Sequence, residues 1–124
     1  KQIDKLDEWG EQRQRNFESY QTLIKNDYWK VKPQEDSFIS NFAYPVIHPN
    51  RDKIVKELQK NNIEVRPMIC GSMGTQPFYV KKYGRLELPN VSIIDKYGFY
   101  IPNHPYLTIE ELELIIDIVN RGCK

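Results

Sequence analysis

Residues 37–69 read SFISNFAYPVIHPNRDKIVKELQKNNIEVRPMI, and this stretch decides the fold. Its first part, Ser37 to His48, is rich in aromatic and β-branched residues, which predicts a strand with a half-buried surface. Phe38 and Phe42 are expected to pack on that surface. Pro45 has no N–H to donate to a neighbouring strand, so it indicates an edge position or a bulge.

The middle of the stretch predicts a helix that begins at Pro49-Asn50. Asn50 is a residue type that caps helix N-termini, and Asp52 places negative charge in the first turn, where the helix dipole favours it. Its buried stripe is expected to consist of three apolar residues, Ile54, Val55 and Leu58. Asn61-Asn62 ends the helix, and Ile63 to Ile69 predicts a second strand.

A long helix is predicted before this stretch, from about Gln2 to Asn26, because apolar residues recur there every three or four positions. Its middle, Glu11 to Asn16, is strongly polar. A long helix of this kind often bridges two bodies, whereas the simpler interpretation is a solvated face, and both stay open. Since the chain begins at Lys1 with no N-cap before the helix, we expect a piece of a longer protein.

The chain after the second strand predicts a long loop, a short helix and a short strand. Cys70 to Lys82 is apolar and contains two glycines, which favours a functional or interface loop. Pro89-Asn90 begins a helix over Val91 to Tyr97, which Gly98 ends. The inward side of this helix is expected to carry Ile93, Ile94 and Tyr97. Phe99 to Ile101 predicts the strand.

The last helix has the clearest local signals. Thr108 and Glu111 have the spacing of a capping box, in which each side chain satisfies the other residue's free amide. Four apolar residues repeat with helical spacing: Leu112, Ile115, Ile116 and Val119. Gly122 is expected to close the helix in the left-handed conformation. The whole order predicts an α+β fold, a small mainly antiparallel sheet with helices on one face, preceded by a long linking helix.

Composition excludes several classes of protein. The 124 residues carry 18 basic and 17 acidic side chains, so the basic excess of a nucleic-acid-binding domain is missing, although aromatic residues such as Phe38 would suit one. No apolar run approaches the roughly 20 residues that cross a bilayer. Two cysteines are too few for a disulfide scaffold, which favours a reducing, cytoplasmic compartment.

Residues that could carry chemistry are sparse, and by itself the chain offers no convincing catalytic residue. His48 and His104 lie in no metal-ligand spacing, so no metal site is predicted. Cys70 and His104 have the residue types of a nucleophile and its base, but a small buried cysteine and a turn histidine explain them more simply. Arg66, held before Pro67, suits bidentate pairing with a carboxylate or phosphate, although a surface strand arginine has the same pattern.

The stretch NIEVRPMICG at residues 62–71 resembles the C-terminal small domain of the DegT-like nucleotide-sugar aminotransferases, which are pyridoxal-phosphate enzymes of fold type I. The branch that contains the 4-keto-6-deoxyhexose 3-dehydratases looks most similar. Further matching stretches follow the family's order over nearly the whole chain: RQRNF (13–17), NRDKIV (50–55), QPFY (76–79), LPN (88–90), GFYI (98–101) and Asn103-His104.

The resemblance implies that residues 1–27 form a helix linking to a large domain and that residues 28–124 form the small domain. It also implies a substrate-binding wall made by five residues: Arg66, Gly71, Ser72, Gln76 and His104. Pyridoxal 5'-phosphate would lie in the large domain, so this chain alone would bind no cofactor and would be inactive. The enzyme would be a cytoplasmic homodimer, either an aminotransferase or a dehydratase, acting on a nucleotide-linked keto-deoxy sugar.

An alternative is a stand-alone binding or regulatory module of ferredoxin-like shape, without catalysis. Such a module needs no missing domain. The long first helix with its polar middle and the start at Lys1, not at methionine, oppose this alternative.

Overall fold

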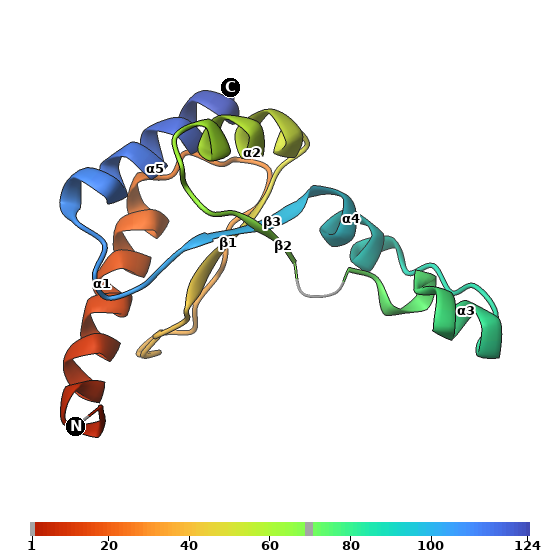
Figure 1. Ribbon diagram of the computed structural model, residues 1–124, viewed down its shortest axis with the longest axis horizontal. Helices are drawn as coiled ribbons and strands as arrows, with labels where there is room; N and C mark the ends of the chain where they lie inside the picture. The colour runs from red at the N-terminus through yellow and green to blue at the C-terminus, as the bar shows by residue number, and fades with distance from the viewer. Residues whose placement is uncertain (1, 69–70) are drawn as a thin grey trace.

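The computed structural model describes residues 2–68 and 71–124 of the chain. Its helical elements are η1 (Ile3–Lys5), α1 (Leu6–Leu23), α2 (Arg51–Lys60), η2 (Met73–Thr75), α3 (Pro77–Tyr83), α4 (Pro89–Tyr97) and α5 (Ile109–Gly122), where η marks a 3-10 helix. Its strands are β1 (Ala43–Ile47), β2 (Arg66–Pro67) and β3 (Gly98–Pro102) (Figure 1).

The three strands form one antiparallel sheet in the order β1-β3-β2. In the middle strand, β3, Tyr100 is paired with Pro45 of β1 on one side and with Arg66 of β2 on the other. Because directly opposite residues point to the same face of a sheet, these three side chains share one face. Pro45 therefore lies on an edge strand, which was one of its two predicted positions.

The opposite face of the sheet carries the hydrophobic core. Phe99 and Ile101 of β3 are buried there beside Tyr44 and Val46 of β1. Residues from α1, α2, α5 and the turn after α1 complete this core: Phe17, Tyr20, Ile24, Ile54, Leu58, Ile115, Ile116, Ile118 and Val119. Figure 1 shows α2 and α5 on one side of the sheet. The predicted fold class, α+β with a small antiparallel sheet and helices on one face, is confirmed.

Both predicted strands of the 37–69 stretch are too long. The first begins only at Ala43, and Phe38 and Phe42 are 63% and 70% exposed, so the prediction that they pack on a half-buried surface is wrong. Both residues precede β1: Phe38 lies beside Gly10 of α1, and the Phe42 ring lies beside the Tyr100 ring on the outer face of the sheet. Among the described residues the second strand is reduced to Arg66–Pro67, where Pro67 has no N–H to donate to the ladder. The predicted end of this strand, Ile69, lies outside the described residues.

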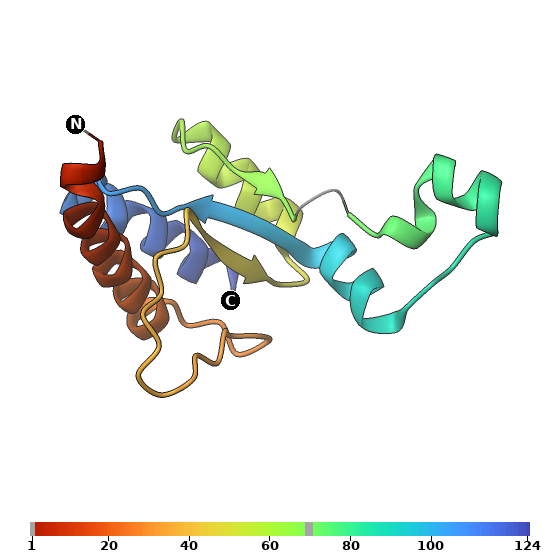
Figure 2. The ribbon, with the colours of Figure 1, turned by 90° about the horizontal axis from the view of Figure 1, so that it is seen from below.

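Residues 71–97, which we call the arm, project from the body of the molecule (Figure 2). The predicted loop over Cys70 to Lys82 is wrong in part, because η2 and α3 lie within it. Pro77 at the first helical position and Gly84, with a φ of 81°, supply the start and stop of α3. Two isoleucines predicted to pack inward from α4 are exposed instead, Ile93 and Ile94.

The helix ends show which helix boundaries can be predicted from local sequence signals. The capping box of α5 is confirmed: Thr108 Oγ1 accepts a bond from the Glu111 amide at 3.2 Å, and Glu111 Oε2 accepts one from the Thr108 amide at 2.9 Å. Helix α1 stops at Leu23, short of the predicted Asn26, because Ile24 turns to an extended conformation and is buried in the core. The end of this helix is therefore set by packing.

Gly122 and Asn50 both differ from their predicted roles at the contact between α2 and α5. Gly122 is the last residue of α5 and does not close it in the left-handed conformation. A Cβ atom there would lie 2.2 Å from Cγ1 of the buried Ile54 of α2. Asn50 sits at the N-cap position of α2, but its side chain donates to the Gly122 carbonyl at 2.9 Å and makes no capping bond. The glycine is required for the close approach of the two helices.

We expect Gly122→Ala to lower the free energy of unfolding by about 1–3 kcal/mol, because Ile54 has no room to move away. Urea denaturation of the 124-residue chain measures this change. Gly10→Ala is the matched control: its Cβ would meet the exposed Phe38 ring at 3.3 Å and Ser40 Oγ at an ordinary contact distance of 3.7 Å, so stability should stay equal or rise by up to about 1 kcal/mol. Equal effects of the two substitutions would contradict this role of Gly122.

Two core tyrosines keep hydrogen-bonded hydroxyl groups. Tyr20 Oη donates to the Pro102 carbonyl at 2.8 Å, and Tyr44 Oη donates to Gln21 Oε1 at 2.5 Å. Burial raises the pKa of Tyr44 to about 12, and burial also raises the pKa of Tyr20 well above its usual range. The unfolded chain therefore loses these phenol protons first, and the folded state loses stability as the pH rises above the ordinary value of 10.0.

We expect urea denaturation between pH 10 and pH 12 to show a falling free energy of unfolding, with Tyr44 contributing up to about 1.4 kcal/mol per pH unit. Tyr44→Phe should lower stability at neutral pH, where the bond to Gln21 is lost, but should flatten this decline. The exposed Tyr106 provides the control, since Tyr106→Phe should leave the slope unchanged. An unaltered slope in Tyr44→Phe would refute the assignment.

Candidate functional site

The outer face of the sheet holds a hollow of about 310 Å³, which we call the sheet-face groove. It is lined by Phe42, Ala43, Glu64, Arg66, Tyr100, Ile101, Pro102, Asn103 and His104. All three strands or their flanking residues contribute, so the antiparallel pairing described above places these residues together. The groove therefore lies on the face that the helices leave open.

Aromatic and cationic side chains meet in this groove because of the strand register. Tyr100 and Arg66 are directly opposite each other on β3 and β2, which puts both on the outer face. The Phe42 ring lies 6.0 Å from the Tyr100 ring, centroid to centroid, at an interplanar angle of 54°. Apolar rings beside a guanidinium suit a ligand that combines an anionic group with a ring or sugar face.

The Arg66 guanidinium is held by one neighbouring carboxylate. Its Nη2 and Nε lie 2.7 Å and 2.8 Å from Oε1 of Glu64, and both side chains are mostly exposed. Exposed ion pairs contribute little to stability, because water screens them and the side chains lose freedom. An anionic ligand could therefore replace Glu64 as the partner of the Arg66 guanidinium at a small cost in free energy. In the absence of the ligand, Glu64 orients the guanidinium.

His104 stands where the groove meets a second hollow of about 430 Å³. Three residues line both hollows: Glu64, Pro102 and His104. The second hollow continues along the C-terminal end of α2 and the first turns of α5, past Asn62 and Glu111. The exposed His104 side chain is thus accessible from both sides and can donate or accept hydrogen bonds at their junction.

The structure brings two of the five predicted wall residues, Arg66 and His104, into one groove and places the other three in the arm. Gly71 has a φ of 64°, and a Cβ there would lie 2.4 Å from Oδ1 of Asp95. Ser72 is buried, and its carbonyl accepts bonds from the amide and hydroxyl of Thr75. Gln76 is half-buried at the start of α3. None of these three lines the sheet-face groove.

Three groove residues were missed when the sequence was analysed for chemistry: Phe42, Tyr100 and Asn103. Alternation along β3 could have found Tyr100, because it lies between the buried Phe99 and Ile101. The predicted alternative pairing of Cys70 with His104 involves a residue outside the described part of the chain.

The described residues were also tested for a resident metal or cofactor. Residues 2–68 and 71–124 contain no group of three or more His, Cys, Asp or Glu side chains that could hold a metal ion. No helix in these two ranges is long and apolar enough to span a membrane. The described lining of the groove contains one guanidinium, one carboxylate and one imidazole but no lysine, so it does not fit a cofactor that is held as a lysine Schiff base.

Known proteins share the sequence pattern and the fold of this chain. The sequence profile of the DegT/DnrJ/EryC1/StrS aminotransferase family matches residues 1–120, and the chain belongs to this family. The resemblance that residues 62–71 indicated is thereby confirmed. A search of curated protein sequences gave no match.

Solved structures agree with this assignment. The sugar aminotransferase CalS13 from Micromonospora echinospora superposes with a TM-score of 0.85 at 15% identity, over 97% of this chain and 32% of its own. A DegT DnrJ EryC1 StrS aminotransferase from Brucella abortus gives 0.82 at 25% identity, over 97% and 32%. The E. coli GDP-4-keto-6-deoxy-D-mannose-3-dehydratase gives 0.74 at 22% identity, over 95% and 32%. The chain spans about a third of the length of these proteins.

Proposed function

We propose that this chain is the C-terminal small domain of a pyridoxal-phosphate enzyme, with residues 28–124 as the domain and residues 1–27 as its linking helix. The enzyme acts on a nucleotide-linked keto-deoxy sugar, and the sheet-face groove forms one wall of its substrate cleft. The family match and the threefold greater length of the relatives support a missing larger part. The E. coli relative was solved with bound hydrated pyridoxal phosphate.

The observation that carries this proposal is the meeting of Arg66, Tyr100 and His104 in one open groove. A nucleotide sugar presents a diphosphate, a sugar ring and a base. The Arg66 guanidinium suits the diphosphate, because planar nitrogen pairs match phosphate oxygens. The Tyr100 and Phe42 rings offer apolar surface to a sugar or base face. His104 can bond a sugar hydroxyl at the junction of the two hollows.

The work of this chain in the proposed enzyme is binding and orientation. Pyridoxal phosphate, when bound, supplies an electron sink for bond cleavage beside its imine. We infer from the family membership that the cofactor lies in the larger part and that this chain alone is inactive. Gly71, Ser72 and Gln76 would meet the substrate from the arm. We infer a cytoplasmic homodimer, in which residues outside this chain decide between amination and dehydration.

We expect Arg66→Ala to weaken nucleotide-sugar binding at least about tenfold in the full-length enzyme, since a charge-assisted contact to the diphosphate is lost. Isothermal titration of the pyridoxal-phosphate-loaded enzyme with UDP-, GDP- and dTDP-linked 4-keto-6-deoxyhexoses measures this change. Affinity for the cofactor should change less than about twofold, because Arg66 does not hold it.

Arg85→Ala is the matched control for this experiment. Arg85 also pairs with a nearby glutamate, Glu87 at 2.6 Å, and is similarly exposed, but it does not line the sheet-face groove. This control should leave sugar-nucleotide affinity within about twofold of the unaltered enzyme. Binding of none of the three sugar nucleotides, or an equal loss in both variants, would overturn the proposed wall.

A further inference from the structure

Two fully or nearly fully buried polar residues connect helix α1 to the sheet-face groove. Asn16 of α1 is 4% exposed and Asn103, which follows β3, is 0% exposed. Burying an amide side chain costs free energy unless it is hydrogen-bonded. The partners of these two amides therefore indicate their structural role. Both residues bond across long distances in the sequence, between α1 and the turn that carries His104.

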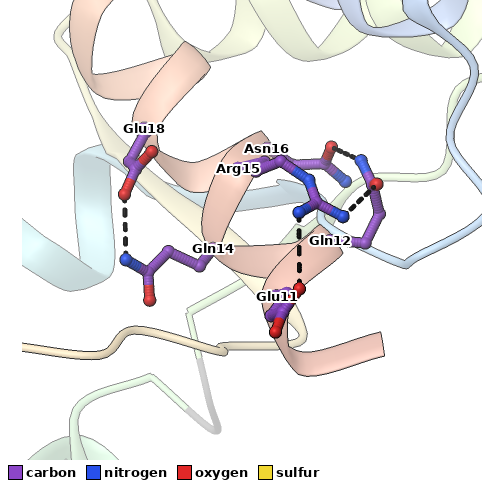
Figure 3. Close-up of polar contacts among 6 residues, drawn as sticks. All are labelled: Glu11, Gln12, Gln14, Arg15, Asn16 and Glu18. Atoms are coloured by element: carbon purple, nitrogen blue, oxygen red, sulfur yellow. Dashed lines mark hydrogen bonds and ion pairs between the residues drawn. The ribbon is translucent and has the colours of Figure 1, made fainter. Parts of the chain in front are cut away.

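The Asn16 amide is fixed at both ends. Its Nδ2 donates to the main-chain carbonyl of His104 at 3.1 Å, and its Oδ1 accepts from Gln12 Nε2 at 3.0 Å. Figure 3 shows Gln12 one turn away on the same helix, bonded to the Asn16 side chain. Because both amide ends are occupied, a rotation of the side chain would break both bonds.

Asn103 fastens the neighbouring position of the groove to the same turn of α1. Its Nδ2 donates to the Arg13 carbonyl at 3.2 Å and to the Asn41 carbonyl at 2.9 Å. Its main-chain amide donates to the Phe42 carbonyl at 3.2 Å. Two consecutive groove residues, Asn103 and His104, are therefore tied to residues 13–16 of one helix, and the first is also tied to the segment that carries Phe42.

Apolar contacts also dock α1. Phe17 and Tyr20, on the following turn, are buried in the hydrophobic core and already hold the helix against the sheet. Asn103 even keeps its Oδ1 buried without a hydrogen-bond partner, which an apolar residue would avoid. What the two asparagines add is the local position of the turn at residues 103–104, which places His104 in the groove.

We propose that Asn16 is a positioning residue, which acts with Asn103 to couple the placement of α1 to the position of His104 and thus to the shape of the substrate groove. The proposal rests on the proposed function of the groove. A displacement of α1 relative to the sheet pulls on the His104 carbonyl and changes the wall that the substrate meets. A movement of the linking helix relative to the larger part of the enzyme thereby changes the position of this wall.

The first test uses the 124-residue chain and needs no substrate. Asn16→Ala removes the donor to His104, and the His104 ring signals in the 1H–13C NMR spectrum should move. Glu18→Ala is the matched control, because Glu18 is exposed on the same helix and, within residues 2–68 and 71–124, bonds Gln14 and not the His104 turn (Figure 3). It should leave the His104 signals in place. Identical His104 signals in the two variants would overturn the coupling.

The second test uses the full-length enzyme and separates positioning from a general loss of structure. Asn16→Ala should raise KM for the nucleotide sugar about tenfold and change kcat less than about twofold, as expected when only uniform substrate binding is lost. Glu18→Ala should change neither value. A parallel fall in kcat and in thermal stability, with KM unchanged, would mean that Asn16 is merely structural.

A milder variant keeps the proposal testable if Asn16→Ala does not fold. Gln12→Ala removes the bond that orients Asn16, together with the exposed bond that Arg15 Nη2 donates to Gln12 Oε1. It leaves the Asn16 donor to His104 in place, so it should shift the His104 signals and KM in the same direction by a smaller amount. If His104 moves while neither Asn16→Ala nor Arg66→Ala changes KM, the proposed function of the groove fails and the coupling stands. If Arg66→Ala raises KM and Asn16→Ala leaves both KM and His104 unchanged, the coupling fails.

Discussion

The antiparallel pairing of β3 with a strand on each side is the constraint on which both the core and the site depend. Alternation along this strand sends Phe99 and Ile101 into the core, where they are almost completely buried. The same alternation sends Tyr100 to the outer face, opposite Arg66. One short strand thus builds two surfaces, and a shift of its register by one residue would exchange them.

Helices cover the inner face of the sheet, whereas the outer face is open among the described residues. On the inner side, α2 and α5 approach so closely that Gly122 leaves no space for a Cβ beside Ile54, and Asn50 bonds the last carbonyl of α5. The outer side carries the open sheet-face groove, which is lined in part by the 70% exposed Phe42. Exposed apolar surface of this kind marks an interaction site. It is consistent with a family whose members are about three times as long.

Features that involve residues within one turn of the chain could be predicted from the sequence. Features that depend on contacts between distant segments could not. The capping box at Thr108 and the stop at Gly98 could be predicted, because each involves neighbours within a few residues. Gly122 could not, since its role depends on Ile54, far away in the sequence. Phe42 has the spacing of the buried Tyr44 and Val46, but the strand begins only at Ala43, so the alternation does not extend to Phe42. Arg66 could be singled out by its residue type, while Tyr100 and Asn103 join the site through register and turn geometry.

The polar middle of α1 shows how one sequence pattern can serve two purposes. Arg15 and Glu18 are exposed and bond along the helix, as a solvated face requires. Arg13 and Asn16 instead donate to Ser40 and to the His104 carbonyl, so this side of the same turns is a polar contact surface. A stripe of apolar residues there would hold the helix equally well but could not specify where a single carbonyl lies. Directional bonds are therefore what the proposed linking role of α1 requires where this helix meets the groove.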